Sequence, residues 1–264
     1  MIFIANNADF SANNLGQIPL YSIEDVSQST LDFLGHYTTG FTDEQKFAVH
    51  MMLTNLGYGN DEGLFNKLTT IIFPFLSNSV EEAFLNAVDW SDITTRPYSA
   101  TKDKFTLAEG VLKDTAGESN IAVNSSAIPN MSFGAINCGA FSSTGGNNNL
   151  SILFDNVSKN IVWSMMVEGI PSYRKTIFSD TNFCVSANSS ELLISDNVIS
   201  TTFDEDESYI GKYVNAIQGM SIQYLRFSAN NGASSIFVGE ALTQSEINAV
   251  LNAIKSCEKA FINL

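Results

Sequence analysis

The chain has 264 residues, a formal net charge of −15 and only 13 lysines and arginines. Phosphate groups are bound by clustered cations, and the sequence has no basic run, so nucleic acid and anionic membrane are not expected as partners. Hydrophobic residues make up 44%, charged residues make up 16%, and there are 17 glycines. This composition favours a β-rich protein, and the length suits one large domain, with or without a smaller attachment.

The cysteines and the first residues bear on where the protein is made. Cys138, Cys184 and Cys257 lie far apart and have no CxxC spacing. They predict neither a disulfide framework nor a zinc site, and no metal or cofactor is expected. Reduced, mostly buried thiols made in a cytosol are the favoured interpretation. The start "MIFIANNADF" does not predict a signal peptide, and no stretch reaches the roughly 18 apolar residues of a membrane span.

The composition of residues 1–30 predicts an extended arm. The segment is rich in asparagine and shows no helical period. Its apolar residues include Phe3, Ile4, Phe10 and Leu15, which we take as the candidate assembly residues. Such a segment does not form a core of its own, so it is expected to lie against its own domain or against a neighbouring chain.

Residues 31–95 are expected to form a helical segment and a linker. The sequence "TDEQ" at 42–45 has the form of a capping box, and apolar residues follow it at helical spacing. A second helix is predicted over 62–73, where Pro74 would end it. The stretch from Ser79 onwards, "SVEEAFLNAVDWSD", fits either a short helix or the first strand of the next domain, with preference for a short helix or turn that leads into a strand.

Residues 96–264 are expected to form a β-sandwich with a C-terminal helix. From residue 104 to residue 238, short runs with period-two alternation are separated by turns rich in Asn, Gly and Ser. Examples are "KFTLAEGVL", "MSFGAINCGAF", "LSILFDN", "NIVWSMMVEG", "TNFCVSAN", "ELLISDNVIS" and "SIQYLRFSAN". This spacing, without alternating helices, predicts an all-β sandwich or barrel.

The end of the chain predicts a closing element. Residues 234–238 fit the last strand, and Thr243 and Glu246 form a second capping box. One helical stripe then carries the apolar residues Ile247, Val250, Leu251, Ile254 and Cys257. We expect this helix to fold back and cover a sheet edge or one end of the sandwich; a partner-binding helix is the alternative.

Two groups of motifs carry a family resemblance that covers about residues 40–262. The strand, "GEALTQSE" and amphipathic helix resemble the end of many concanavalin A-like (laminin-G/lectin-type) jelly-roll domains. "GLFNKLTTIIFPF" at 63–75, "FLNAVDWSD" at 84–92 and the stretch at 104–126 resemble tailed-bacteriophage and prophage structural proteins, tail- or head-associated. The resemblance implies a mainly β, concanavalin A-like jelly-roll fold and a virion context. It carries no catalytic motif, and the fold serves several functions.

Catalytic patterns are weak. The acidic run "DEDE" at 204–207 lacks the carboxylate spacing of jelly-roll glucanases and predicts a solvated loop. His36 and His50 have no partner in a recognisable motif, so structural roles are favoured for both. The candidate glycan-loop residues are Asn147, Asn148, Asp180 and Asn182, and the candidate aromatic platforms include Trp90 and Trp163, the latter favoured as a core residue.

The sequence therefore predicts a non-enzymatic virion structural protein from the tail, neck, fibre or head decoration. Its partners would be other virion proteins and copies of itself in a symmetric oligomer. It would be made in the host cytoplasm. The alternative is a glycan-binding, receptor-recognising lectin domain of a phage particle, with host surface glycans as partners. A glycoside hydrolase comes third.

Overall fold

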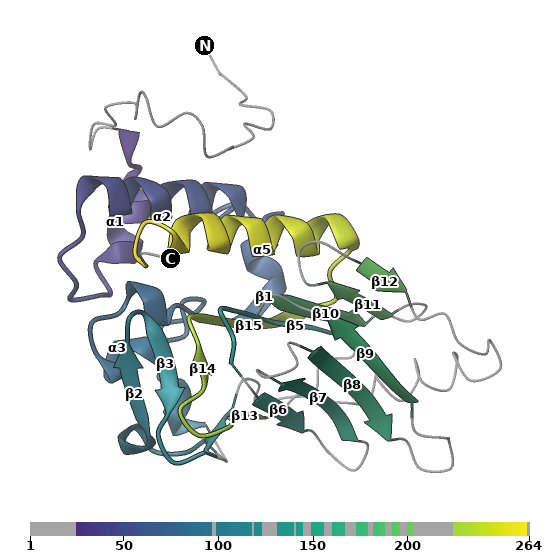
Figure 1. Ribbon diagram of the computed structural model, residues 1–264. Coiled ribbons are helices and arrows are strands. Elements are labelled where there is room, and N and C mark those ends of the chain that lie inside the picture. Colours follow the sequence, from purple (N-terminus) through teal and green to yellow (C-terminus); the bar gives the residue numbers. More distant parts are fainter. Residues whose placement is uncertain are drawn as a thin grey trace, which may run out of the picture.

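Two six-stranded antiparallel β-sheets, a small three-stranded sheet and a layer of helices form the described part of the protein (Figure 1). The computed structural model describes residues 25–96, 99–117, 119–122, 131–139, 141–144, 149–155, 160–166, 173–178, 182–187, 192–195, 200–202 and 224–262. Helices α1 (Gln28–Leu34), α2 (Asp43–Asn55) and α5 (Gln244–Glu258) lie on one side of the first sheet, and the second sheet lies on its other side. The short helix α3 (Val80–Ala83) lies instead beside β2 (Phe105–Ala108). The predicted mainly β, jelly-roll-like sandwich is confirmed.

The first sheet has the strand order β1-β15-β5-β10-β11-β12. Its strands are β1 (Leu68–Ile72), β15 (Ser235–Glu240), β5 (Met131–Ile136), β10 (Phe183–Ala187), β11 (Leu192–Ser195) and β12 (Ser200–Thr202). Residues 235–239 of β15 are all buried. This is the burial expected of a central strand that is covered on both faces rather than on one.

The second sheet has the strand order β4-β13-β6-β7-β8-β9. Its strands are β4 (Asn120–Ile121), β13 (Tyr224–Phe227), β6 (Phe141–Thr144), β7 (Asn149–Asp155), β8 (Asn160–Met166) and β9 (Tyr173–Phe178). A small third sheet contains β14 (Gly232–Ala233), β3 (Val111–Asp114) and β2 (Phe105–Ala108). The chain passes from the first sheet to the second after β5 and returns at β10, so neighbouring strands in a sheet are often distant in sequence.

The helices include both capped elements that the sequence predicts. The α-helices in the described residues are α1 (Gln28–Leu34), α2 (Asp43–Asn55), α3 (Val80–Ala83) and α5 (Gln244–Glu258). Reciprocal capping boxes join Thr42 with Gln45 at the start of α2, and Thr243 with Glu246 at the start of α5. In the described part of the chain, no helix is both long enough and apolar enough to cross a membrane.

Helix α5 covers a face of the first sheet and not an edge or an end of the sandwich. It packs against α2 and contacts the inner strands β5, β10 and β11 (Figure 1). The predicted apolar stripe is confirmed, because all five of its residues are buried. These residues join one core with side chains of α1, α2 and β1. The helix therefore ties the helical layer to the sandwich.

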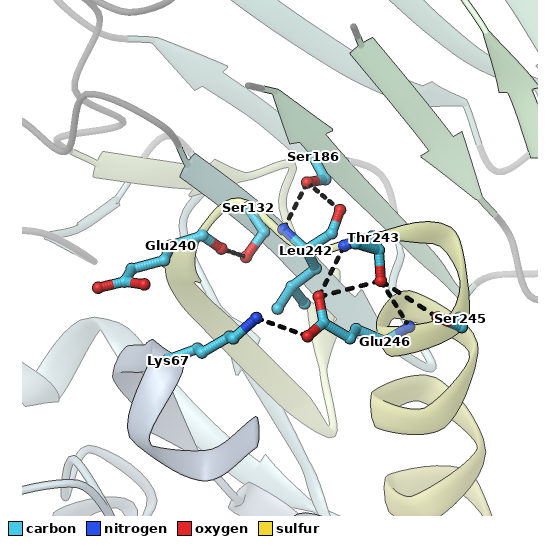
Figure 2. A network of polar contacts seen from close by, with 8 residues as sticks. All are labelled: Lys67, Ser132, Ser186, Glu240, Leu242, Thr243, Ser245 and Glu246. Carbon is cyan, nitrogen blue, oxygen red and sulfur yellow. Dashed lines mark hydrogen bonds and ion pairs between the residues drawn. The ribbon is translucent and has the colours of Figure 1, made fainter. Parts of the chain in front are cut away.

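A polar network fixes the start of α5 (Figure 2). The ammonium of Lys67 lies 2.5 Å from a carboxylate oxygen of Glu246, whose other oxygen accepts a hydrogen bond from the Thr243 N–H. The Ser186 hydroxyl, on β10, donates to the Leu242 carbonyl and accepts from the Leu242 N–H. Bonds from two parts of the chain thus hold the turn between β15 and α5.

The prediction of a helix over residues 62–73 is wrong. A short 3-10 helix spans Leu64–Lys67, and strand β1 follows. The β1 sequence "LTTII" contains four β-branched residues, which suit a strand better than a helix. Antiparallel pairing with β15, from Leu68 with Gly239 to Ile72 with Ile236, gives this segment its place in the sheet.

The ambiguous stretch after Ser79 is a short helix followed by turns. Ser79 caps α3 by accepting a hydrogen bond from the Glu82 N–H. No strand is assigned over 84–92, which is fully described and contains one isolated bridge between Leu85 and Asp92. The preferred short helix is confirmed, but the strand that was expected to follow it is not found there.

Candidate functional site

A tightly bonded loop over 86–91 follows α3 and lies against β1. Its centre is Asn86, which is fully buried. The Asn86 carboxamide accepts from the Ile71 N–H at 2.9 Å and donates to the Thr69 carbonyl at 3.1 Å. It also donates to the carboxylate of Asp89 at 2.9 Å. One side chain thus fixes the loop both to itself and to the neighbouring strand.

This loop holds Trp90 in an unusual backbone conformation. The φ angle of Trp90 is +60°, in the left-handed region where a bulky residue is an outlier. The Trp90 N–H donates to the Asn86 carbonyl at 2.6 Å, and the Asn86 N–H donates to the Ser91 carbonyl at 2.8 Å. These bonds maintain the strained conformation, and strain of this kind is concentrated at functional sites.

A second aromatic ring stacks on the indole of Trp90. The imidazole of His36 lies parallel to it, with 3.7 Å between ring centroids and 7° between planes. His36 is exposed and Trp90 is half-buried. Phe33 and Tyr37 meet the indole at steep angles, with centroids at 5.0 Å and 5.9 Å. The result is a supported aromatic platform whose outer ring is an imidazole.

Val88 and Asp89 directly precede Trp90 in the same loop, and both are exposed. Val88 is one of two large exposed hydrophobic residues in the described part of the chain. Partial burial acts to raise the pKa of Asp89, but hydrogen bonds from Ser91 and Asn86 and the charge of Arg96 outweigh it and lower that pKa. Asp89 therefore presents an ionised acceptor. A flat ring, an imidazole nitrogen and a carboxylate together suit a ligand with one apolar face and several hydroxyls.

The structure describes only one of the predicted glycan-loop residues, Asn182. It is buried, and its side-chain oxygen accepts from the Asn137 N–H at 2.9 Å. Asn147, Asn148 and Asp180 lie outside the described residues. The arm residues Phe3, Ile4, Phe10 and Leu15 also lie outside the described residues. The end of the arm predicted over 1–30 is part of helix α1, which begins at Gln28. The acidic run at 204–207 is likewise outside.

Sequence reasoning identified Trp90 as a candidate platform but not its pairing with His36. The two residues are far apart in the chain, and no local motif links them. Their contact depends on the packing of α1 against the loop after α3. The Asn86 hub was also missed, because an asparagine before an Ala-Val pair has no distinctive spacing.

The surroundings of the three cysteines and of His50 suit structural roles. Burial raises the pKa of Cys138, Cys184 and Cys257, so these cysteines stay protonated. His50 lies 3.1 Å from the Thr30 hydroxyl, within hydrogen-bond distance. Among the described residues, no group of three or more His, Cys, Asp or Glu side chains could hold a metal ion.

Comparison with known proteins gives only weak likenesses. No family model matches the chain, and no curated protein matches it. One structure, the binding domain of botulinum neurotoxin DC in complex with rat synaptotagmin II, aligns at 12% identity with a TM-score of 0.35, over 52% of this chain and 40% of that one. Another concerns botulinum neurotoxin type C, whose cell entry depends on two ganglioside molecules. It aligns at 13% identity with a TM-score of 0.36, over 53% and 41%.

A third structure is CG-16, a homodimeric agglutinin from chicken liver. It aligns at 15% identity with a TM-score of 0.27, over 47% of this chain and 97% of that one. The aligned parts cover about two fifths of the toxin chains. Because all these TM-scores lie below 0.5, the likenesses carry no argument about what this chain does.

Proposed function

We propose that the chain is a non-catalytic carbohydrate-binding domain, with the His36–Trp90 pair as its platform. The observation that carries the proposal is the exposed imidazole stacked flat on an indole that is held at φ +60°. A pyranose ring has an apolar face that stacks on aromatic rings and a rim of hydroxyls that need hydrogen-bond partners. The imidazole and the nearby carboxylate of Asp89 would supply these partners.

Preorganisation supports this use of the platform. A loop already fixed by the bonds of Asn86 loses little conformational entropy when a ligand binds. Helix α5 contacts the inner strands of the first sheet and covers one of its faces, so a ligand would not reach that face. The ligand would therefore meet the helical layer and the loops beside it.

A glycan array followed by calorimetry tests the proposal. We expect retention of at least one pyranose-containing glycan and about a fivefold to tenfold loss of affinity in His36→Ala, because an aromatic contact is worth about 1 kcal/mol. Glu44→Ala, an exposed change on α2, is the matched control and should bind like the unaltered protein. A chain that binds no glycan, or glycan binding that His36→Ala leaves unchanged, would contradict the proposal.

The second proposal is a structural protein of a tailed-phage particle. It is supported by the resemblance of residues 63–75 and 84–92 to such proteins, and by an apolar residue on the outer side of the helical layer, Met51, which is 42% exposed. Quantitative mass spectrometry of purified particles tests it. A copy number matching a symmetric site would support it, and absence from particles would exclude it.

A further inference from the structure

Strand β1 lies at the end of the first sheet's strand order, and among the described strands it pairs with β15 alone. Its sequence "LTTII" contains no charged residue and no proline, which are two of the devices that keep edge strands from pairing with other chains. The register with β15 is irregular between Leu68 and Thr70 and regular from Thr70 to Ile72. The outer side of β1 is therefore an edge suited to pairing with a further strand.

The loop over 86–91 occupies this edge. The carboxamide of Asn86 imitates a backbone peptide group, since it accepts from the Ile71 N–H at 2.9 Å and donates to the Thr69 carbonyl at 3.1 Å. The next residue, Ala87, donates its N–H to the Ile71 carbonyl at 2.8 Å. Residues two apart in a strand direct their backbone polar groups to the same side, so these three groups are the ones that a further strand would bind.

We propose that this loop, which we call the β1 cover, is releasable, and that β1 pairs with β1 of a second copy when the cover opens. The two edges are identical and uncharged, and antiparallel pairing is self-complementary, so two copies would join about a two-fold axis. Trp90 within the cover is held at φ +60°. Opening relieves this strain, which partly offsets the loss of the three hydrogen bonds. The proposal does not depend on carbohydrate binding.

Asn86→Ala in the full-length chain opens the cover, and sedimentation velocity over a concentration series measures the association. The weight-average mass should rise with concentration to about twice that of the unaltered chain. Leu251→Ala is the control for lost stability, because Leu251 is fully buried in α5 and its truncation leaves the bonds of the cover in place. No association in Asn86→Ala, or equal association in the two variants, would overturn the proposal.

Thr69→Lys tests whether β1 is the contact. Thr69 is exposed, so the lysine places a charge on the edge with little loss of core packing. Added to Asn86→Ala, it should weaken the association about tenfold or more, because like charges would meet across the pair. Asn252→Lys, at an exposed position of α5, adds the same charge elsewhere and should leave the association unchanged. Association that persists with Thr69→Lys would place the contact on another surface and overturn the proposal.

Hydrogen exchange of the unaltered protein tests the cover without any substitution. The amide of Ile71 should exchange through opening of the loop alone, about tenfold or more faster than the amide of Phe237 in the central strand β15. Its exchange should also depend less on urea, because local opening exposes less surface than global unfolding does. Equal rates and equal urea dependence for the two amides would mean that the loop opens only on global unfolding, and would overturn the proposal.

Discussion

The imidazole of His36 lies flat on the indole of Trp90, 3.7 Å between centroids, although no local motif connects the two residues. Trp90 takes this position because the buried side chain of Asn86 joins the loop over 86–91 to β1 by hydrogen bonds. The stack is therefore a consequence of one asparagine's hydrogen bonds as much as of ring attraction.

Asn86→Ala should destabilise the protein and disorder the platform. The change leaves the Ile71 N–H and the Thr69 carbonyl without their side-chain partner, and each buried polar group left unpaired costs about 1–3 kcal/mol. We expect a loss of about 2–4 kcal/mol in urea unfolding and a weaker near-UV signal from Trp90. Asn86→Asp keeps the acceptor but loses the donors, so it should also destabilise. Unchanged stability in both variants would contradict this role.

Gly134→Ala should disrupt the centre of the first sheet. Gly134 pairs with Phe237 across β5 and β15, and a Cβ at residue 134 would lie 2.1 Å from the ring of Phe237. Overpacking of this kind costs about 1–3 kcal/mol or more. Gly40→Ala is the control, since a Cβ there meets nothing within 4 Å. Combining Gly134→Ala with Phe237→Leu should recover part of the loss, and a purely additive double variant would argue against the clash.

Thr243→Ala should loosen the start of α5. The Thr243 hydroxyl accepts from the Glu246 N–H in the capping box, and loss of such a cap costs about 1 kcal/mol. Thermal unfolding should show a lower midpoint, while Ser245→Ala, an exposed neighbour in the same turn, should change it far less. Equal effects of the two substitutions would show that the cap is not the cause.

Glu258→Gln should stabilise the protein at neutral pH. Glu258 is 2% exposed, and one of its carboxylate oxygens has no hydrogen-bond partner. Burial raises its pKa above the ordinary 4.5, although Ser234, Asn137 and Lys255 oppose the shift. The folded state therefore holds this proton to a higher pH than the unfolded state does, and stability falls as pH rises from about 4.5 through the folded pKa.

Glutamine removes that fall because it does not ionise. The gain at pH 7 should be about 1 kcal/mol, the cost of an unsatisfied buried polar group, and it should vanish well below the unfolded-state pKa. Unfolding curves for both proteins across the acid-to-neutral range measure it. A constant difference at every pH would mean that packing, and not the titration of Glu258, is responsible.

Local signals in the sequence identified some elements well. The capping boxes at Thr42 and Thr243 need only a few neighbouring residues, and both helices begin where these motifs place them. The alternating runs likewise marked β5, β7, β8 and β15, because side-chain period in a strand is a local property. The mainly β fold class followed from their spacing.

Elements that depend on distant pairing were not predicted. Residues 62–73 contain a short apolar run that fits a helix or a strand, and only pairing with β15 decides for β1. Strand β9 is not among the runs that the sequence singled out, since "YRKTIF" has two adjacent cations. The candidate site also depends on contacts between residues distant in the chain. Asn86 is hydrogen-bonded to Ile71 of β1, and His36 stacks on Trp90.

Fluorine NMR of the fluorotryptophan-labelled protein tests the central claim most directly. The chain has two tryptophans, so the spectrum has two resonances, which Trp163→Phe would assign. On titration with glycans retained on an array, the Trp90 resonance should shift and saturate, the Trp163 resonance should stay, and His36→Ala should weaken the response. A Trp90 resonance that stays fixed while glycan binds would place the binding elsewhere and contradict the platform.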